Sequence, residues 1–242
     1  MDKIKITLIR IGYVDRLINF KKIKKWKSKI FEIVDIQCIE HLSDDIINRS
    51  IQDGYLDLKY QKEDMDILIK EIPKNGNIAV AIIPYRFVDN HYLHRIDNRA
   101  VVSLDGIKNI LDIDNISIEN FIIRQLYKLC ARSLFEECSN HLDSRGCLYD
   151  MNGNRTHIIY NTEKPIICDD CKGKIKRCQV SQQALPTLEK ELKKIKKTFL
   201  LKVELCIKKY PLLSIIVSAI VAIGITAIFD LIWELIIINK TS

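Results

Sequence analysis

The pattern of apolar and polar positions predicts an α+β domain in the first part of the chain. Apolar and polar residues alternate in some segments, and residues 77–83 are a continuous apolar run, as in a buried strand. Strands are therefore predicted over residues 3–11, 31–39, 77–83, 91–96 and 100–104. Helices are predicted over residues 14–28, 44–52, 62–70, 107–111 and 118–136. We expect a mixed sheet with the long helix 118–136 packed on one face, and a hairpin at Asp97-Asn98-Arg99.

The C-terminal part has a different pattern. Residues 211–229 carry no charge, and apolar residues resume at 231–238. About 20 apolar residues in a helix cross a bilayer, so we expect one transmembrane helix over 211–238. Basic residues dominate the segment before it, which places that side in the cytoplasm. The expected location is a bacterial inner membrane, crossed once.

Composition and charge refine this picture. The chain has 242 residues, 48% hydrophobic and 29% charged, which excludes a disordered tail and a polytopic transporter. Its net charge is +7, with one basic cluster at residues 21–29 and another at 172–209. Such clusters attract phosphates of nucleic acid or lipid. With no secretory signal, the eight cysteines are expected to be reduced, as metal ligands or core residues.

Three parts follow: a domain at 1–180, a basic helix at 181–210 and the transmembrane helix at 211–238. Apolar residues of the basic helix recur at nearly heptad spacing, which allows packing either on its own domain or on copies of itself. These residues are Leu188, Leu192, Ile195, Phe199, Val203, Cys206 and Tyr210.

Polar residues inside the apolar run suggest more than an anchor. Small and hydroxyl-bearing residues recur every four positions and lead to two carboxylates, as expected of close helix packing in lipid. One interpretation is a pore formed by a homo-oligomer and lined by Ser214, Ser218, Thr226, Asp230 and Glu234. The alternative is a plain anchor with two carboxylates at the membrane surface.

Cysteine and histidine spacing predicts a metal site after the long helix. Cys168 and Cys171 form a CxxC pair, which supplies half of a tetrahedral zinc site. His141 and Cys147 are the simplest remaining ligands, with Cys138 as a substitute for His141. Four protein ligands leave no open position, so this zinc would be structural. The alternative is a set of thiols without metal.

This stretch resembles the archaemetzincins, a branch of the metzincin metallopeptidases. The family has H-E-x-x-H-x-x-G-x-x-H-C, then C-x-M, then C-x-x-C. His141 matches its last histidine or the neighbouring position, Cys147 the cysteine before the methionine (here Met151), and Cys168 and Cys171 the final pair. The resemblance implies a zincin-like fold over roughly residues 1–178, a catalytic zinc on three histidines and a second zinc on four cysteines.

The family's catalytic residues do not carry over. Residues 123–135 contain no histidine and no glutamate, so the HExxH zinc clasp and its general base are missing. We therefore expect no peptidase activity. A relocated site with His91 or His94 and His157 is an alternative, although strand residues three apart point to opposite faces.

A domain without its catalytic metal is suited to binding. Five arginines that fall where the cleft would lie favour an anionic ligand, a nucleotide or an oligonucleotide such as DNA. They are Arg86, Arg95, Arg99, Arg124 and Arg132. A sensor domain followed by a membrane helix resembles, in layout, the transmembrane effectors of bacterial anti-phage systems such as the Hailong type, in which a partner enzyme makes the ligand. This layout leads to the hypothesis of a ligand-controlled membrane effector. The alternatives are a membrane-tethered zinc metallopeptidase and a membrane adaptor that binds nucleic acid.

Overall fold

The computed structural model describes most of the chain. The described residues are 2–39, 59–60, 66, 69–70, 72, 76–87, 91–135, 140–142, 146–177, 183–196, 203, 207 and 209–241. They belong to two compact units, Met1–Lys196 and Lys197–Ser242.

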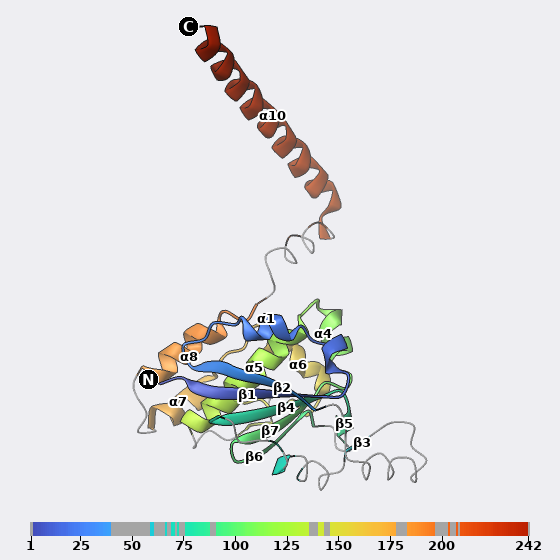
Figure 1. Cartoon of the computed structure of the whole chain (residues 1–242), viewed down its shortest axis with the longest axis vertical. Coiled ribbons are helices and arrows are strands. Elements are labelled where there is room, and N and C mark those ends of the chain that lie inside the picture. Colours follow the sequence, from blue (N-terminus) through green and yellow to red (C-terminus); the bar gives the residue numbers. More distant parts are fainter. Residues whose placement is uncertain are drawn as a thin grey trace. The chain divides into compact units, whose positions relative to one another are not determined.

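A five-stranded mixed sheet forms the centre of the first unit (Figure 1). Its strand order is β2-β1-β4-β7-β6, with parallel pairing from β2 to β7 and an antiparallel edge strand β6. The strands span Ile4–Ile11 (β1), Phe31–Ile39 (β2), Ile78–Ile83 (β4), Leu93–Ile96 (β6) and Arg99–Ser103 (β7). Two short strands, β3 (Lys59–Tyr60) and β5 (Arg86–Phe87), pair separately.

Helices accompany the sheet, and the long helix α5 is the central one. Their bounds are Phe20–Lys24 (α1), Ile107–Ile113 (α4), Ile118–Leu134 (α5), Ile158–Glu163 (α6), Asp169–Arg177 (α7) and Ala184–Leu192 (α8). Alternate residues of each strand separate two apolar clusters: Val80 packs in the large cluster that contains α5, whereas Ala81 packs with Phe87 in a smaller one. The predicted mixed sheet with a long helix on one face is confirmed.

The basic helix predicted over residues 14–28 is much shorter. Asn19 caps α1, because its side-chain oxygen accepts a hydrogen bond from the backbone N–H of Lys22 at 3.1 Å, and the helix ends at Lys24. Only a single 3-10 turn, Val14–Arg16, precedes the cap. The helix predicted over 44–52 lies outside the described residues, as does most of the one over 62–70.

The first unit extends through the start of the predicted basic helix. Leu188, Leu192 and Ile195 are at most 1% exposed and belong to the large core cluster. These three residues of the heptad-like row therefore pack on their own domain, and the compact unit runs to Lys196 rather than to residue 180.

The second unit contains the helix α10, Pro211–Thr241. Among the residues that the structure describes, no helix combines the length and the apolar character required to cross a membrane. The described residues therefore do not support the predicted transmembrane helix over 211–238. The predicted single-pass location in a bacterial inner membrane is wrong for the same reason.

The proposed pore lining loses its basis with the membrane helix. The hydroxyls of Ser214, Ser218 and Thr226 each donate a hydrogen bond to the carbonyl four residues earlier, at 2.9, 2.8 and 3.0 Å. Their polar groups are thus satisfied within α10 itself. The side chains of Asp230 and Glu234 lie outside the described part. The homo-oligomer stays a prediction.

One buried carboxylate joins three segments of the first unit. Glu191 of α8 is 1% exposed, and its Oε2 accepts hydrogen bonds from the Tyr127 hydroxyl at 2.9 Å and from the Lys29 backbone N–H at 3.2 Å. Lys194 Nζ lies 2.5 Å from Oε1. Burial alone would raise the pKa of Glu191, but these hydrogen bonds outweigh burial and lower it.

We predict that Glu191→Gln destabilises the protein by about 1–3 kcal/mol at neutral pH, because hydrogen bonds to a charged group are lost. The lowered pKa means that the ionised carboxylate stabilises the fold above the ordinary value of 4.5 and that this contribution disappears as the pH falls through the folded-state value. Chemical unfolding as a function of pH measures both effects.

Glu189→Gln is the matched control for this prediction. Glu189 lies on the same helix but is partly exposed, and it pairs with Lys172 at 3.0 Å. A partly exposed pair contributes about 0–1 kcal/mol. Equal losses in the two variants would contradict a special role for Glu191.

Candidate metal centre and adjoining pocket

His141, Cys147, Cys168 and Cys171 converge on one point. Their ligand atoms all lie within 4.8 Å of one another, and the three cysteines are buried. The Cys147 and Cys171 sulfurs are 3.9 Å apart, and His141 Nε2 is 3.5 Å from the Cys168 sulfur. The structure thus brings together the four residues that were expected to bind zinc. Cys138, the alternative ligand, lies outside the described residues.

The geometry fits a tetrahedral zinc ion. Zn–S bonds of about 2.3 Å and Zn–N bonds of about 2.0 Å at tetrahedral angles separate two sulfurs by about 3.8 Å and a sulfur from a nitrogen by about 3.5 Å. These separations match the two distances within the cluster. One imidazole and three thiols could therefore hold a zinc ion with four protein ligands, the composition of a structural site.

Asp150 orients the ligands from behind. Its carboxylate is fully buried, and Oδ1 lies 3.2 Å from His141 Nδ1, so that His141 Nε2 faces the cysteines. Asp150 Oδ2 accepts a hydrogen bond from the Cys147 backbone N–H at 2.9 Å. A carboxylate behind a ligating histidine fixes the ring and increases its basicity. The sequence prediction missed Asp150, although only two acidic residues, Asp143 and Asp150, lie between His141 and Met151.

The surroundings of Cys147 and Cys171 oppose ionisation of their thiols. Burial raises the pKa of Cys147, and the neighbouring Cys168 thiol adds to the increase. Burial and the adjacent Cys147 thiol likewise raise the pKa of Cys171. A divalent ion would compensate the charge of the thiolates, and its binding would be coupled to folding of this part of the chain.

Two cations of α5 hold the backbone of the metal-binding segment. Arg124 is fully buried, and its Nη2 donates to the Leu148 carbonyl at 3.1 Å and more weakly to the Cys147 carbonyl at 3.5 Å. Lys128 Nζ donates to the Asp150 carbonyl at 2.9 Å. Burial, with Arg124 and Arg132 nearby, lowers the pKa of Lys128 well below its usual range.

A pocket of about 360 Å³ lies between the edge strand β6, the C-terminal half of α5 and the metal-binding segment. No described residue that lines it is acidic. The lining residues are Phe87, His91, Tyr92, Leu93, His94, Arg95, Lys128, Arg132, Asn140 and Met151. The side-chain oxygen of Asn140 is buried without a hydrogen-bond partner in the described part of the chain.

The five arginines of the predicted ligand site do not all lie in one pocket. Arg95 and Arg132 share the pocket beside β6, and burial followed by repulsion from Arg95 lowers the pKa of Arg132. Arg124 is a structural residue in the core, because backbone carbonyls surround its guanidinium. Arg86 is exposed on β5, and Arg99 donates to the Ile69 and Lys70 carbonyls at 3.3 Å. The prediction missed Lys128, which completes a row of cations at spacing four with Arg124 and Arg132.

His91 and His94 line the same pocket, contrary to the expectation that they point to opposite faces. The reason is that β6 begins only at Leu93, so His91 is not a strand residue. His94 Nε2 contacts Asp66 Oδ1 at 2.9 Å, and the His157 ring packs against Tyr160. Apart from the four-residue cluster, the described residues contain no group of three His, Cys, Asp or Glu side chains placed to hold a metal.

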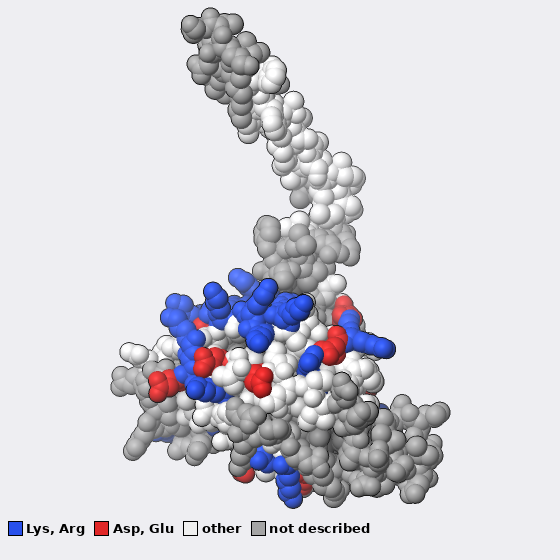
Figure 2. Space-filling view, viewed as in Figure 1, with Lys and Arg blue, Asp and Glu red and all other residues white. Residues whose placement is uncertain are grey.

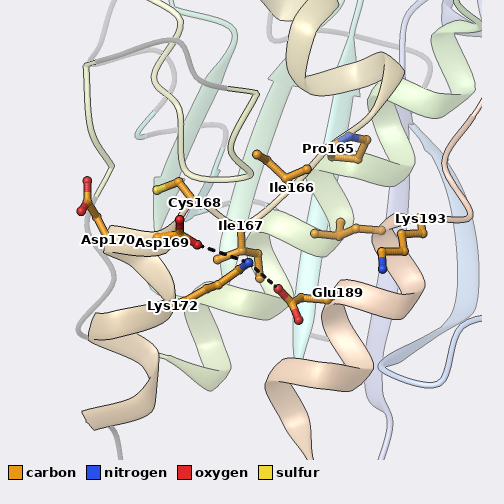
Figure 3. Close-up of a pocket in the computed structure, with 10 residues that line it drawn as sticks. Pro165, Ile166, Ile167, Cys168, Asp169, Asp170, Lys172, Glu189 and Lys193 are labelled. Atoms are coloured by element: carbon orange, nitrogen blue, oxygen red, sulfur yellow. Dashed lines mark ion pairs between the residues drawn. The ribbon is translucent and has the colours of Figure 1, made fainter.

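A second pocket, of about 740 Å³, adjoins the metal cluster through Cys168 (Figure 3). In Figure 3, Lys172 of α7 lies between Asp169 of the same helix and Glu189 of α8, and dashed lines mark both ion pairs. Asp170 and Lys193 also line this pocket. Its charges are of both signs and partly neutralise one another, so it favours no class of ligand.

Comparisons with known proteins found a structural likeness but no match in sequence. No protein-family model matches the chain, and no curated protein matches its sequence. Among solved structures, the chain is similar to an archaemetzincin from Methanopyrus kandleri, with a TM-score of 0.48 and 11% sequence identity. The match covers 72% of this chain and 94% of that one. A similarity of this size transfers no activity to the present chain.

We predict that the purified protein contains one zinc ion per chain and that Cys171→Ser loses it. Because zinc binding is coupled to folding, this variant should also unfold at a lower temperature. Elemental analysis and thermal unfolding measure the two effects. Cys38→Ser, which changes an exposed cysteine outside the cluster, is the matched control and should keep the zinc. A metal-free wild type whose stability does not respond to a strong chelator would overturn the assignment.

Asp150→Asn should weaken zinc binding about 10–100-fold without removing a ligand. An amide can accept the Cys147 N–H or contact His141, but it carries no negative charge to increase the basicity of the imidazole. Competition with a chromophoric chelator measures this affinity. Unchanged affinity in a folded Asp150→Asn variant would show that the carboxylate has no role in tuning the metal.

Proposed function

We propose that the unit Met1–Lys196 is a zincin-like binding domain, stabilised by zinc, that takes an anionic ligand in the pocket beside β6. It does not hydrolyse peptides. The ligand class is a phosphate-bearing molecule, a nucleotide or the end of an oligonucleotide. The role in anti-phage defence rested on a membrane helix behind a sensor and has no part in this proposal.

The observation that carries the proposal is the charge of the pocket. Lys128 and Arg132 lie one helical turn apart on α5, and Arg95 faces them from β6. Like charges at this spacing repel one another. No described lining residue offers a carboxylate in compensation. An anion bound between these groups would relieve the repulsion and form charge-assisted hydrogen bonds.

The size and the chemistry of the pocket suit a phosphate group. A volume of about 360 Å³ accommodates a small ligand. The planar guanidinium groups of Arg95 and Arg132 can each bind a phosphate through two parallel N–H···O contacts. Tyr92 and Phe87 supply an apolar wall.

The same residues argue against metallopeptidase chemistry. An HExxH helix holds zinc with imidazoles at positions i and i+4. At the i and i+4 positions of α5 that face the pocket stand Lys128 and Arg132 instead of imidazoles, and the Arg132 guanidinium repels a metal ion. A carboxylate to activate water is also missing from the described lining residues.

We predict that Arg132→Gln weakens the binding of a mononucleotide at least about tenfold, because a charge-assisted contact contributes about 1.5–3 kcal/mol. Isothermal titration calorimetry with a nucleoside 5′-monophosphate measures the effect. The parent nucleoside, which lacks the phosphate, is the ligand control and should not bind measurably. Arg177→Gln, at an exposed position of α7, is the protein control and should bind like the wild type.

Two results would contradict the proposal. Equal affinity for the nucleotide and the nucleoside would show that the pocket does not recognise an anion. Chelator-sensitive cleavage of a peptide library by the purified protein would show that the domain is an enzyme.

A further inference from the structure

A second cationic surface lies over α1 and the end of α8, far from the pocket. We call it the lysine face. Its members are exposed lysines from two segments: Lys21, Lys22, Lys24, Lys25, Lys27, Lys29, Lys193, Lys194 and Lys196. Figure 2 shows Lys and Arg side chains gathered on this side of the domain, above α1, with few acidic side chains among them.

Tertiary contacts bring the two segments together. The Lys29 backbone N–H and the Lys194 ammonium group bind the same buried carboxylate, Glu191. The Lys196 carbonyl accepts a hydrogen bond from Asn120 of α5 at 3.3 Å, and Lys22 Nζ contacts Glu119 of the same helix at 3.1 Å. The lysine face is therefore a property of the fold, since its parts are separated by more than half of the chain.

Most of its charge is not neutralised. Lys22 and Lys194 form ion pairs with Glu119 and Glu191. The other seven lysines form no ion pair with a carboxylate in the described part of the chain. Seven cations at fixed positions raise the local potential and attract a polyanion.

The surface lacks the apolar groups that a lipid-binding surface uses. Ile23, Ile30 and Ile195 lie between the lysines in sequence, but each is at most 1% exposed. Trp26 is half-buried, and its Nε1–H donates a hydrogen bond to the Tyr127 hydroxyl at 3.0 Å. A helix that lies in a membrane interface combines basic residues with exposed apolar side chains that enter the lipid. No apolar side chain is fully exposed among the described residues that lie between these lysines in sequence, which favours a hydrated polyanion over a membrane.

We propose that the lysine face binds the phosphate backbone of a nucleic acid without reading its base sequence. Lysine ammonium groups contact phosphates as point charges, and they release counterions when they do so. Lys29 of the face lies just before the edge strand β2, whereas the anion pocket lies beside β6 at the opposite edge of the sheet. The two sites are thus separate, and this proposal does not depend on the proposed function.

The test compares two triple variants of the full chain that lose the same charge. Lys24, Lys25 and Lys27 are changed to Ala in the first, and the exposed Lys70, Lys164 and Lys176 in the second. Fluorescence anisotropy with a labelled 20-base-pair duplex and a second duplex of scrambled sequence gives the affinity at several salt concentrations. Thermal unfolding of both variants checks that they are folded.

We expect both duplexes to bind the wild type equally, with an affinity that falls steeply with salt. The lysine-face variant should lose at least about tenfold in affinity at low salt, and its log K against log[salt] slope should decrease by about three. The control triple variant should keep the wild-type slope.

Each other outcome overturns the proposal. No binding of the wild type, or equal losses in the two triple variants, would show that the lysine face is not a specific surface. Vesicles of phosphatidylcholine and phosphatidylserine form a further arm. If the lysine-face substitutions abolish vesicle binding but leave duplex binding unchanged, the ligand is a lipid headgroup.

Discussion

Two buried basic side chains of α5 anchor the metal-binding segment, and both the metal cluster and the pocket beside β6 depend on this anchoring. Arg124 and Lys128 donate to backbone carbonyls of residues 147, 148 and 150 from within the core. A buried cation is costly unless its donors are satisfied, so these contacts strongly favour one position of the segment. That position places Cys147 beside Cys171 and Asp150 behind His141, and it also sets the floor of the pocket beside β6.

The α5 helix therefore serves three purposes along one row of side chains. Arg124 is fully buried in the core. Lys128 donates a hydrogen bond to the metal-binding segment and also lines the pocket, and Arg132 lines the pocket. The same helix also supports the lysine face, through Glu119 and Tyr127. The ligand site and the lysine face are thus built on one rigid element, which fixes their separation.

The sequence predicted the parts of this structure that depend on local pattern. Alternation located β1 and β2 to within a residue, and helical spacing located α5, because burial on one face repeats at a fixed period. The CxxC pair and the upstream His141 and Cys147 were identifiable because few residue types bind metals.

The pattern failed where a single side chain sets the boundary of an element. Asn19 caps α1, so that the helix begins at Phe20, and no periodicity of apolar residues reveals such a cap. It also failed for Arg124, because an arginine inside an apolar helix gives no sign of whether carbonyls or a ligand will meet its guanidinium. The partners of Arg124 lie more than twenty residues away, in a segment whose position only the fold determines.

The spacing of the basic residues on α5 also bears on whether the pocket beside β6 is suited to anion binding or to metal-dependent hydrolysis. A metal held by two imidazoles at i and i+4 would attract an anionic or carbonyl oxygen and would activate a bound water. Lys128 and Arg132 stand at that spacing in this chain, and neither is an imidazole. The Arg132 guanidinium would attract an anion and oppose the entry of a metal ion. Zinc at the cysteine cluster could coexist with this arrangement, because its four protein ligands would leave that ion no open position.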